Sequence, residues 1–220
     1  MLKNLFSMAM ALILCMGLGA SGASMAALGT GADVQATQVA VLLDTPSGYF
    51  AEPEKVYESI QNTLNNIFKG SSLYKVQPLG ETDAYLQIYR EEHDLANNME
   101  NGYMTVAGRD LSLKKENVNE LCKSLGADYV IYTRVTNSMP RYTGGFGSAG
   151  QKVNVVLDFR VWSNKKEDYV YTKRTTTTGS SSTFYVGGVG SSSHAVEDGL
   201  IKGLHEVEKD ATKIRLAMIE

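Results

Sequence analysis

Cysteine and histidine are scarce in this chain of 220 residues, which contains two cysteines and three histidines. Cys15 lies in an apolar amino-terminal segment, and removal of that segment would leave Cys122 without an intrachain disulfide partner. The fold must then be stable through its core alone. His93, His194 and His205 show no metal-ligand spacing, and the last two would lie roughly 16 Å apart along one helix. We therefore predict no metal and no cofactor.

An excess of basic residues is also missing. Lysine and arginine number 21 against 24 aspartate and glutamate, a formal net charge of −3. If Lys3 is removed with the amino-terminal segment, 21 − 1 = 20 basic residues remain and the charge becomes −4. No basic stripe is present, so we predict no nucleic acid as a partner. The hydrophobic content of 43% is ample for a buried core.

The chain has no hydrophobic run long enough for a confident membrane anchor. After Lys3 the apolar residues continue for roughly a dozen positions and then give way to glycine, alanine and serine, whereas a membrane helix needs about 20. Small residues flank Met25 as in an Ala-x-Ala cleavage site, so residues 1–26 are predicted to be a signal peptide. We expect export to the periplasm or the exterior, peripheral to the envelope and without a stable membrane span after cleavage. An uncleaved anchor is the alternative.

Residues 27–36 are predicted to be a flexible lead-in and residues 37–220 a single α/β domain. Alternating or continuous apolar residues predict strands, and apolar residues three and four apart predict helices. The fold class is an α+β sandwich, in which a mixed, mostly antiparallel sheet of about five strands packs with about four helices. The expected strands are 39–43, 73–76, 129–135, 153–162 and 169–176, and the expected helices are 53–69, 82–95, 113–125 and 196–218.

The predicted carboxy-terminal helix is long and carries two glycines. Its apolar residues recur at spacings of three and four from Val196 to Met218, over more than six turns. Gly199 and Gly203 lie on or beside this apolar face, although each costs about 1 kcal/mol in helix propensity. We therefore expect this helix to approach the sheet closely at both positions.

Three segments resemble a group of envelope proteins. They are Gln38–Asp44, Leu73–Val76 and Leu121–Ile131, the last reading Leu-Cys-Lys-Ser-Leu-Gly-Ala-Asp-Tyr-Val-Ile. This chain resembles proteins with the fold of the TolB amino-terminal domain, among them the curli secretion channel subunit and lipoprotein activators of peptidoglycan synthases. It departs from them at Gln77–Leu79, where a Glu-Arg pair is usual, and in lacking a clear lipid-bearing cysteine. The resemblance implies a non-enzymatic envelope accessory protein with a protein or peptidoglycan-associated partner, and an oligomer is possible.

No residues suggest catalysis. Cys122 belongs to an apolar helical stripe and is predicted to be buried, while Glu91, Glu92 and Asp94 suit a solvated helix face. Neither glycine-rich segment has the sequence of a phosphate-binding P-loop. Two alternatives stay open, a hydrolase with a scattered site and a subunit of a ring-like secretion or assembly complex.

The glycine-rich segments 139–151 and 175–193 are predicted to be surface loops that bind the partner together with the sheet edge. They contain too few apolar residues to form membrane-spanning hairpins. Aromatic side chains often anchor partners at interfaces. The candidate binding residues are Tyr142, Phe146, Phe184 and Tyr185.

Overall fold

The computed structural model describes residues 36–45, 50–69, 71–93, 95, 99–100, 103–104, 113–145, 148–183 and 190–219. The predicted signal peptide and nearly all of the lead-in lie outside these residues. The described helices are α2 (Pro53–Phe68), α3 (Leu79–Glu92), α4 (Lys115–Ser124), α5 (Ser192–Glu208) and α6 (Ala211–Ile219). The strands are β1 (Thr37–Asp44), β2 (Tyr74–Val76), β3 (Met99–Glu100), β4 (Tyr103–Met104), β5 (Tyr129–Asn137), β6 (Arg141–Gly145), β7 (Ser148–Ser163) and β8 (Asp168–Thr183).

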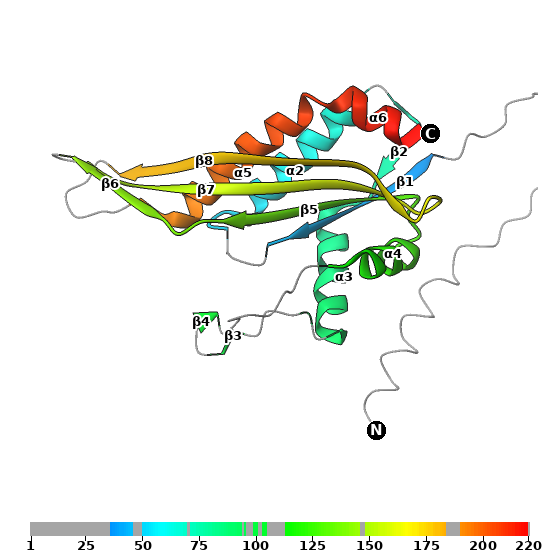
Figure 1. Cartoon of the computed structure of the whole chain (residues 1–220), viewed down its shortest axis with the longest axis horizontal. Helices are drawn as coiled ribbons and strands as arrows, with labels where there is room; N and C mark the ends of the chain where they lie inside the picture. The colour runs from blue at the N-terminus through cyan, green and yellow to red at the C-terminus, as the bar shows by residue number, and fades with distance from the viewer. Residues whose placement is uncertain are drawn as a thin grey trace, which may run out of the picture. The chain divides into compact units, whose positions relative to one another are not determined.

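Six of these strands form one mixed sheet, which confirms the predicted fold class with one more strand and one more helix than expected (Figure 1). β1 pairs in parallel with β2 and β5, and β7 pairs antiparallel with β5, β6 and β8. β8 follows β7 along almost its whole length. β5 and β6 therefore both pair with the other edge of β7. β5 pairs with residues 155–163 of β7, and β6 pairs with residues 148–152.

The first face of the sheet is covered by α2, α5 and α6 (Figure 1). Alternate residues of β7, which the sequence pattern placed on one face, are all buried there: Val153, Val155, Leu157, Phe159 and Val161. The second face is covered by α3 and α4 in a smaller core that includes Trp162 and Tyr132. β1 contributes to both cores, as its continuous apolar sequence predicted.

The glycine-rich segments are largely strands, so their prediction as loops was wrong. β8 continues through the Thr and Ser run to Thr183, and β6 with the start of β7 occupies most of 139–151. Threonine favours strands, and nearly every β8 residue gains a paired neighbour on β7. The turn-like composition of these segments was therefore overridden by pairing with a long neighbouring strand.

The carboxy-terminal apolar stripe forms two helices rather than one. α5 ends at Glu208, and α6 begins at Ala211 after Asp210, whose carbonyl accepts the backbone N–H of Ile214. Asp210 also accepts hydrogen bonds from Lys173 and Tyr171 of β8 through its side chain. These bonds hold Asp210 against β8 at the break, and α6 then contacts α2.

Gly199 and Gly203 lie against the sheet, as predicted. A Cβ added at Gly199 would be 2.5 Å from Cγ2 of Val155, and one added at Gly203 would be 3.1 Å from Cδ2 of Leu157. The contact is closest at Gly179 of β8, where an added Cβ would be 1.7 Å from the carbonyl oxygen of Ala195. Glycine is therefore required on both sides of the α5–β8 contact.

The start of α3 differs from the prediction. The sequence pattern predicted a helix over 82–95, but the helix begins at Leu79, directly after Pro78. Thr82 is buried in the first turn, and its hydroxyl donates to the carbonyl of Leu79. By contrast, α4 ends at Ser124, next to the predicted end at residue 125, and Gly126 follows it with a φ of 60°.

Candidate functional site

The two outer edges of the long antiparallel part of the sheet differ in how their backbone groups are satisfied. On β8, the N–H of Ser180 donates to the carboxylate of Asp198 at 2.8 Å, and Lys202 donates to the carbonyl of Thr178 at 3.2 Å. Asp198 and Lys202 also pair with each other at 2.7 Å. Charged side chains of α5 therefore occupy this edge and oppose the addition of another strand.

The edge formed by the end of β5 and by β6 is open among the described residues. β1 reaches only as far as the pairs Leu43 with Thr133 and Asp44 with Arg134. Beyond this point the end of β5 and the whole of β6 pair with β7 alone in the described part of the chain. An unpaired strand edge offers a row of backbone N–H and C=O groups to another chain.

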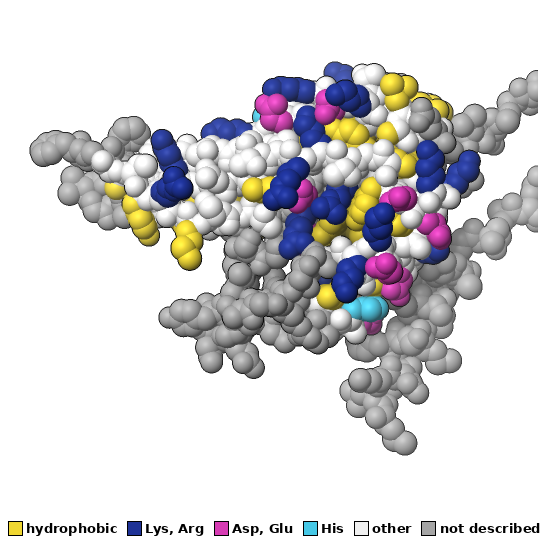
Figure 2. Space-filling model, viewed as in Figure 1, with side chains coloured by type: hydrophobic (Ala, Val, Ile, Leu, Met, Phe, Trp, Pro, Cys, Tyr) yellow, Lys and Arg dark blue, Asp and Glu magenta, His cyan; other side chains and the backbone are white. Residues whose placement is uncertain are grey.

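Two exposed hydrophobic side chains lie at this open edge. Met139, between β5 and β6, is 88% exposed, and Tyr142 of β6 is 75% exposed. Hydrophobic side chains project from the β6 end of the sheet in Figure 2. Tyr142 is the one predicted binding residue that the structure describes, because Phe146, Phe184 and Tyr185 lie outside the described residues.

A second surface, which no described helix or strand covers, lies on the face of the sheet that carries α3 and α4. Pairing partners share a face, so the register places Arg134, Asp158 and Arg174 in one row across β5, β7 and β8. The next row contains Tyr132, Arg160 and Thr172. Towards the β6 end, the same face carries Arg141 and Lys152, and Figure 2 shows cationic side chains over much of the visible sheet.

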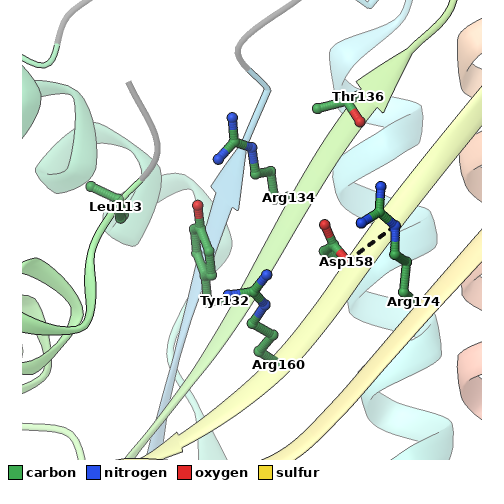
Figure 3. Close-up of a pocket in the computed structure, with 7 residues that line it drawn as sticks. All are labelled: Leu113, Tyr132, Arg134, Thr136, Asp158, Arg160 and Arg174. Atoms are coloured by element: carbon green, nitrogen blue, oxygen red, sulfur yellow. Dashed lines mark ion pairs between the residues drawn. The ribbon is translucent and has the colours of Figure 1, made fainter. Parts of the chain in front are cut away.

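The row of charges lines a groove of about 260 Å³ (Figure 3). Its lining residues are Leu113, Tyr132, Arg134, Thr136, Asp158, Arg160 and Arg174. Figure 3 shows Asp158 between Arg134 and Arg174, with a 3.8 Å ion pair joining Asp158 to the Nε atom of Arg174. The groove therefore combines three guanidinium groups with one carboxylate. None of these seven residues pairs a nucleophile with a general base.

A buried ion pair lies beside the groove. The Asp44 carboxylate at the end of β1 is 2.7 Å from the guanidinium of Arg90 on α3, and both side chains are almost fully buried. Tyr132 donates a hydrogen bond to the same carboxylate, while Arg134 is 4.0 Å away. Burial and the Asp44 charge raise the pKa of Tyr132 far above its usual value, so its hydroxyl stays a donor. Because Arg90 neutralises Asp44, Arg134 keeps most of its charge available to the groove.

Arg160 is held in place by an aromatic side chain. Its guanidinium carbon is 5.5 Å from the centre of the Tyr169 ring, a cation–π contact. Its Nε atom is buried and donates no hydrogen bond to a described residue. A buried donor without a partner is uncommon and calls for an explanation.

The remaining candidates for catalysis or metal binding, where the structure describes them, are a buried core residue and exposed helix residues. Cys122 is buried in the smaller core, where burial raises the pKa of its thiol to about 12, as its apolar stripe predicted. Glu91 and Glu92 are exposed at the end of α3, and Asp94 lies outside the described residues. Across the described ranges, His, Cys, Asp and Glu residues form no cluster of three or more that suits a metal ion. No helix among them is both long and apolar enough to cross a membrane.

Sequence reasoning named Tyr142, which stays a prediction, and missed the arginine groove. Asp158 and Arg160 are two residues apart, but Arg134 lies 24 residues before Asp158 and Arg174 lies 16 residues after it, and none belongs to a motif. The sequence signal for the groove is the alternation of apolar and polar residues in β7, which places Asp158 and Arg160 on the face opposite the buried valines. Which residues of β5 and β8 lie beside them depends on strand register.

No family model matches this chain, and no curated protein matches it. Several solved structures are similar at low identity. A lipoprotein from Neisseria meningitidis, GNA1162, is 13% identical over 80% of this chain and 98% of its own, with a TM-score of 0.35. The PelC dodecamer from Paraburkholderia phytofirmans is 16% identical over 79% and 88%, with a TM-score of 0.35. The C-terminal domain of LpoB from Salmonella enterica is 11% identical over 66% and 85%, with a TM-score of 0.28.

Proposed function

We propose that this chain is an exported, non-enzymatic accessory protein of the bacterial cell envelope that binds an extended segment of another envelope protein. The signal-peptide pattern of residues 1–26 supports export. The observation that carries the binding proposal is the open edge of β6, flanked by the exposed Met139 and Tyr142.

An extended segment suits this edge for two physical reasons. A partner strand can form main-chain hydrogen bonds with β6 while its alternate side chains contact Met139 and Tyr142. The edge of β8 is already occupied by Asp198 and Lys202, so a second strand is directed to β6. Tyrosine is also enriched among the residues that contribute most to binding at interfaces.

Site-specific photo-crosslinking in the producing cells tests the proposal. A photoreactive phenylalanine analogue at position 142 should crosslink to an envelope protein, and the crosslink should map to an extended segment of it. The matched control is the same analogue at Ile88, which is 53% exposed on α3, far from the edge in sequence and in element. Equal crosslinking at both positions, or none at position 142, would contradict the proposal.

Two further outcomes would replace the partner that we propose. A crosslink to a second copy, together with a discrete ring in light scattering, would favour the ring-subunit alternative. Binding of the protein to isolated peptidoglycan, unaffected by Tyr142→Ala, would favour a polymer ligand held elsewhere. In the expected case, adding the crosslinked partner's segment as a peptide slows hydrogen exchange in β6 and leaves β8 unchanged.

A further inference from the structure

We propose that the groove on β5, β7 and β8 is a binding site for a phosphate group, held by Arg134, Arg160 and Arg174. This inference concerns a different surface from the β6 edge and does not depend on a protein partner. It accounts for two features together: the local positive charge and the position of three arginines on neighbouring strands around one groove.

The charge of the groove is opposite to that of the whole chain. The chain carries a net charge of −3, whereas the groove combines three arginines with Asp158 alone. Arg174 and Asp158 are 3.8 Å apart, which is too long for a hydrogen bond, so this pair leaves the donors of Arg174 free. Asp44 is paired with Arg90 at 2.7 Å, and its ion pair with Arg134 is 4.0 Å long, which is too long for a hydrogen bond.

The three arginines come from three neighbouring strands, an arrangement that favours a tetrahedral anion. Arg134 and Arg174 lie on the two strands that flank β7, and Arg160 lies on β7 itself, two residues beyond Asp158. A single bidentate arginine is enough for a planar carboxylate. Donors that approach from three strands instead suit a phosphate, which presents three or more oxygens in different directions.

Arg160 lines the groove between the other two arginines, and its guanidinium group carries a fixed positive charge there. The Tyr169 ring restricts the guanidinium, so Arg160 loses little freedom on binding. The groove volume of about 260 Å³ holds a phosphate together with several waters, at about 30 Å³ for each water.

The first experiment titrates the protein with inorganic phosphate at constant ionic strength and follows the arginine Nε–Hε signals by NMR. We expect saturable shifts of the Arg160 signal. The variant Arg134→Gln/Arg174→Gln should bind phosphate at least tenfold more weakly, since it removes two of the three charged hydrogen-bond donors of the groove. The control is Lys165→Gln/Lys166→Gln, which changes the net charge equally at the exposed β7–β8 turn and should bind like the parent.

A second experiment identifies the source of the phosphate. Glycerol phosphate represents a soluble ester, and phosphatidylglycerol vesicles represent a lipid headgroup, with phosphatidylcholine vesicles as the neutral comparison. Loss of vesicle binding in the double arginine variant alone would assign the site to lipid, and loss of glycerol phosphate binding alone would assign it to a soluble or polymeric ester.

The proposal fails if phosphate shifts do not saturate, or if the double arginine and double lysine variants bind phosphate equally. The single variant Arg174→Gln controls for misfolding of the double variant. The Arg174 side chain is 68% exposed and should be replaceable without loss of the fold. This variant should weaken phosphate binding severalfold with an unchanged melting temperature. Neither result alters the crosslinking test at Tyr142, so the two proposals can fail separately.

Discussion

The contact between α5 and the sheet depends on the absence of a side chain at Gly199. A Cβ at this position would lie 2.5 Å from Cγ2 and 2.9 Å from Cβ of Val155, whereas carbon atoms in contact are about 3.5–4.0 Å apart. Val155 is fully buried on a central strand, so it has no room to move away. Relief therefore requires α5 to retreat from the sheet, and overpacking of this kind costs about 1–3 kcal/mol.

Gly203→Ala is a matched comparison on the same helix. Both substitutions gain about 1 kcal/mol of helix propensity, but the new Cβ at position 203 would be 3.1 Å from Cδ2 of Leu157 and 3.2 Å from Oγ1 of Thr175, the ends of side chains that can adjust. We expect Gly199→Ala to lower the free energy of unfolding by about 1–2 kcal/mol relative to Gly203→Ala.

Urea unfolding, followed by the fluorescence of Trp162, measures this difference. Trp162 is the single tryptophan of the chain and is 2% exposed, so its emission reports loss of the core. Gly80→Ala provides a calibration, because no atom lies within 4 Å of the added Cβ and the variant should match or exceed the parent. The packing argument is refuted if Gly199→Ala is as stable as Gly203→Ala.

Three other predictions concern buried or hydrogen-bonded ionisable groups. Asp44→Asn should destabilise the fold by about 3–5 kcal/mol in urea unfolding, because it leaves the buried Arg90 charge without its partner; a change below 1 kcal/mol would mean that the pair is not buried as described. With residues 1–26 removed, Cys122 should resist a thiol reagent at pH 8 until the protein unfolds, since its pKa is raised to about 12, and reaction at the unfolded rate would contradict its burial. The hydrogen bond from Lys173 is the largest of the effects that lower the pKa of Asp210 to about 2. The ionised carboxylate therefore stabilises the fold above about pH 4, and this stabilisation is lost as the pH falls towards 2. Asp210→Asn should therefore flatten the dependence of melting temperature on pH over that interval, and an unchanged slope would refute the assignment.

Local sequence patterns were sufficient to predict the central strands and the first helix. The alternation of β7, the continuous apolar run of β1 and the stripe of α2 each follow from burial on one face or on two, which is a property of a short segment. The same reasoning identified Gly199 and Gly203 as contact positions, because a glycine on an apolar helix face has a cost that only close packing offsets.

The extent of β8 and the break before α6 could not be predicted locally. The Thr, Ser and Gly run of β8 has the composition of a loop, and it becomes a strand because β7 supplies a paired neighbour at nearly every residue. The apolar stripe of the last 25 residues fits one helix equally well. The break lies at Asp210, whose carboxylate accepts tertiary hydrogen bonds from Lys173 and Tyr171 of β8.

The sequence by itself predicted an export signal, and it determined the class of the fold and the residues that fill its core. All three depend on the spacing of residues along the chain. Tertiary structure alone decided the two candidate binding surfaces. Among the described residues, the edge of β6 is open because β1 ends at Asp44, and the groove exists because strand register aligns Arg134, Asp158 and Arg174. Charges far apart in sequence become neighbours only through pairing, and a strand edge is free or covered only in relation to the strands beside it.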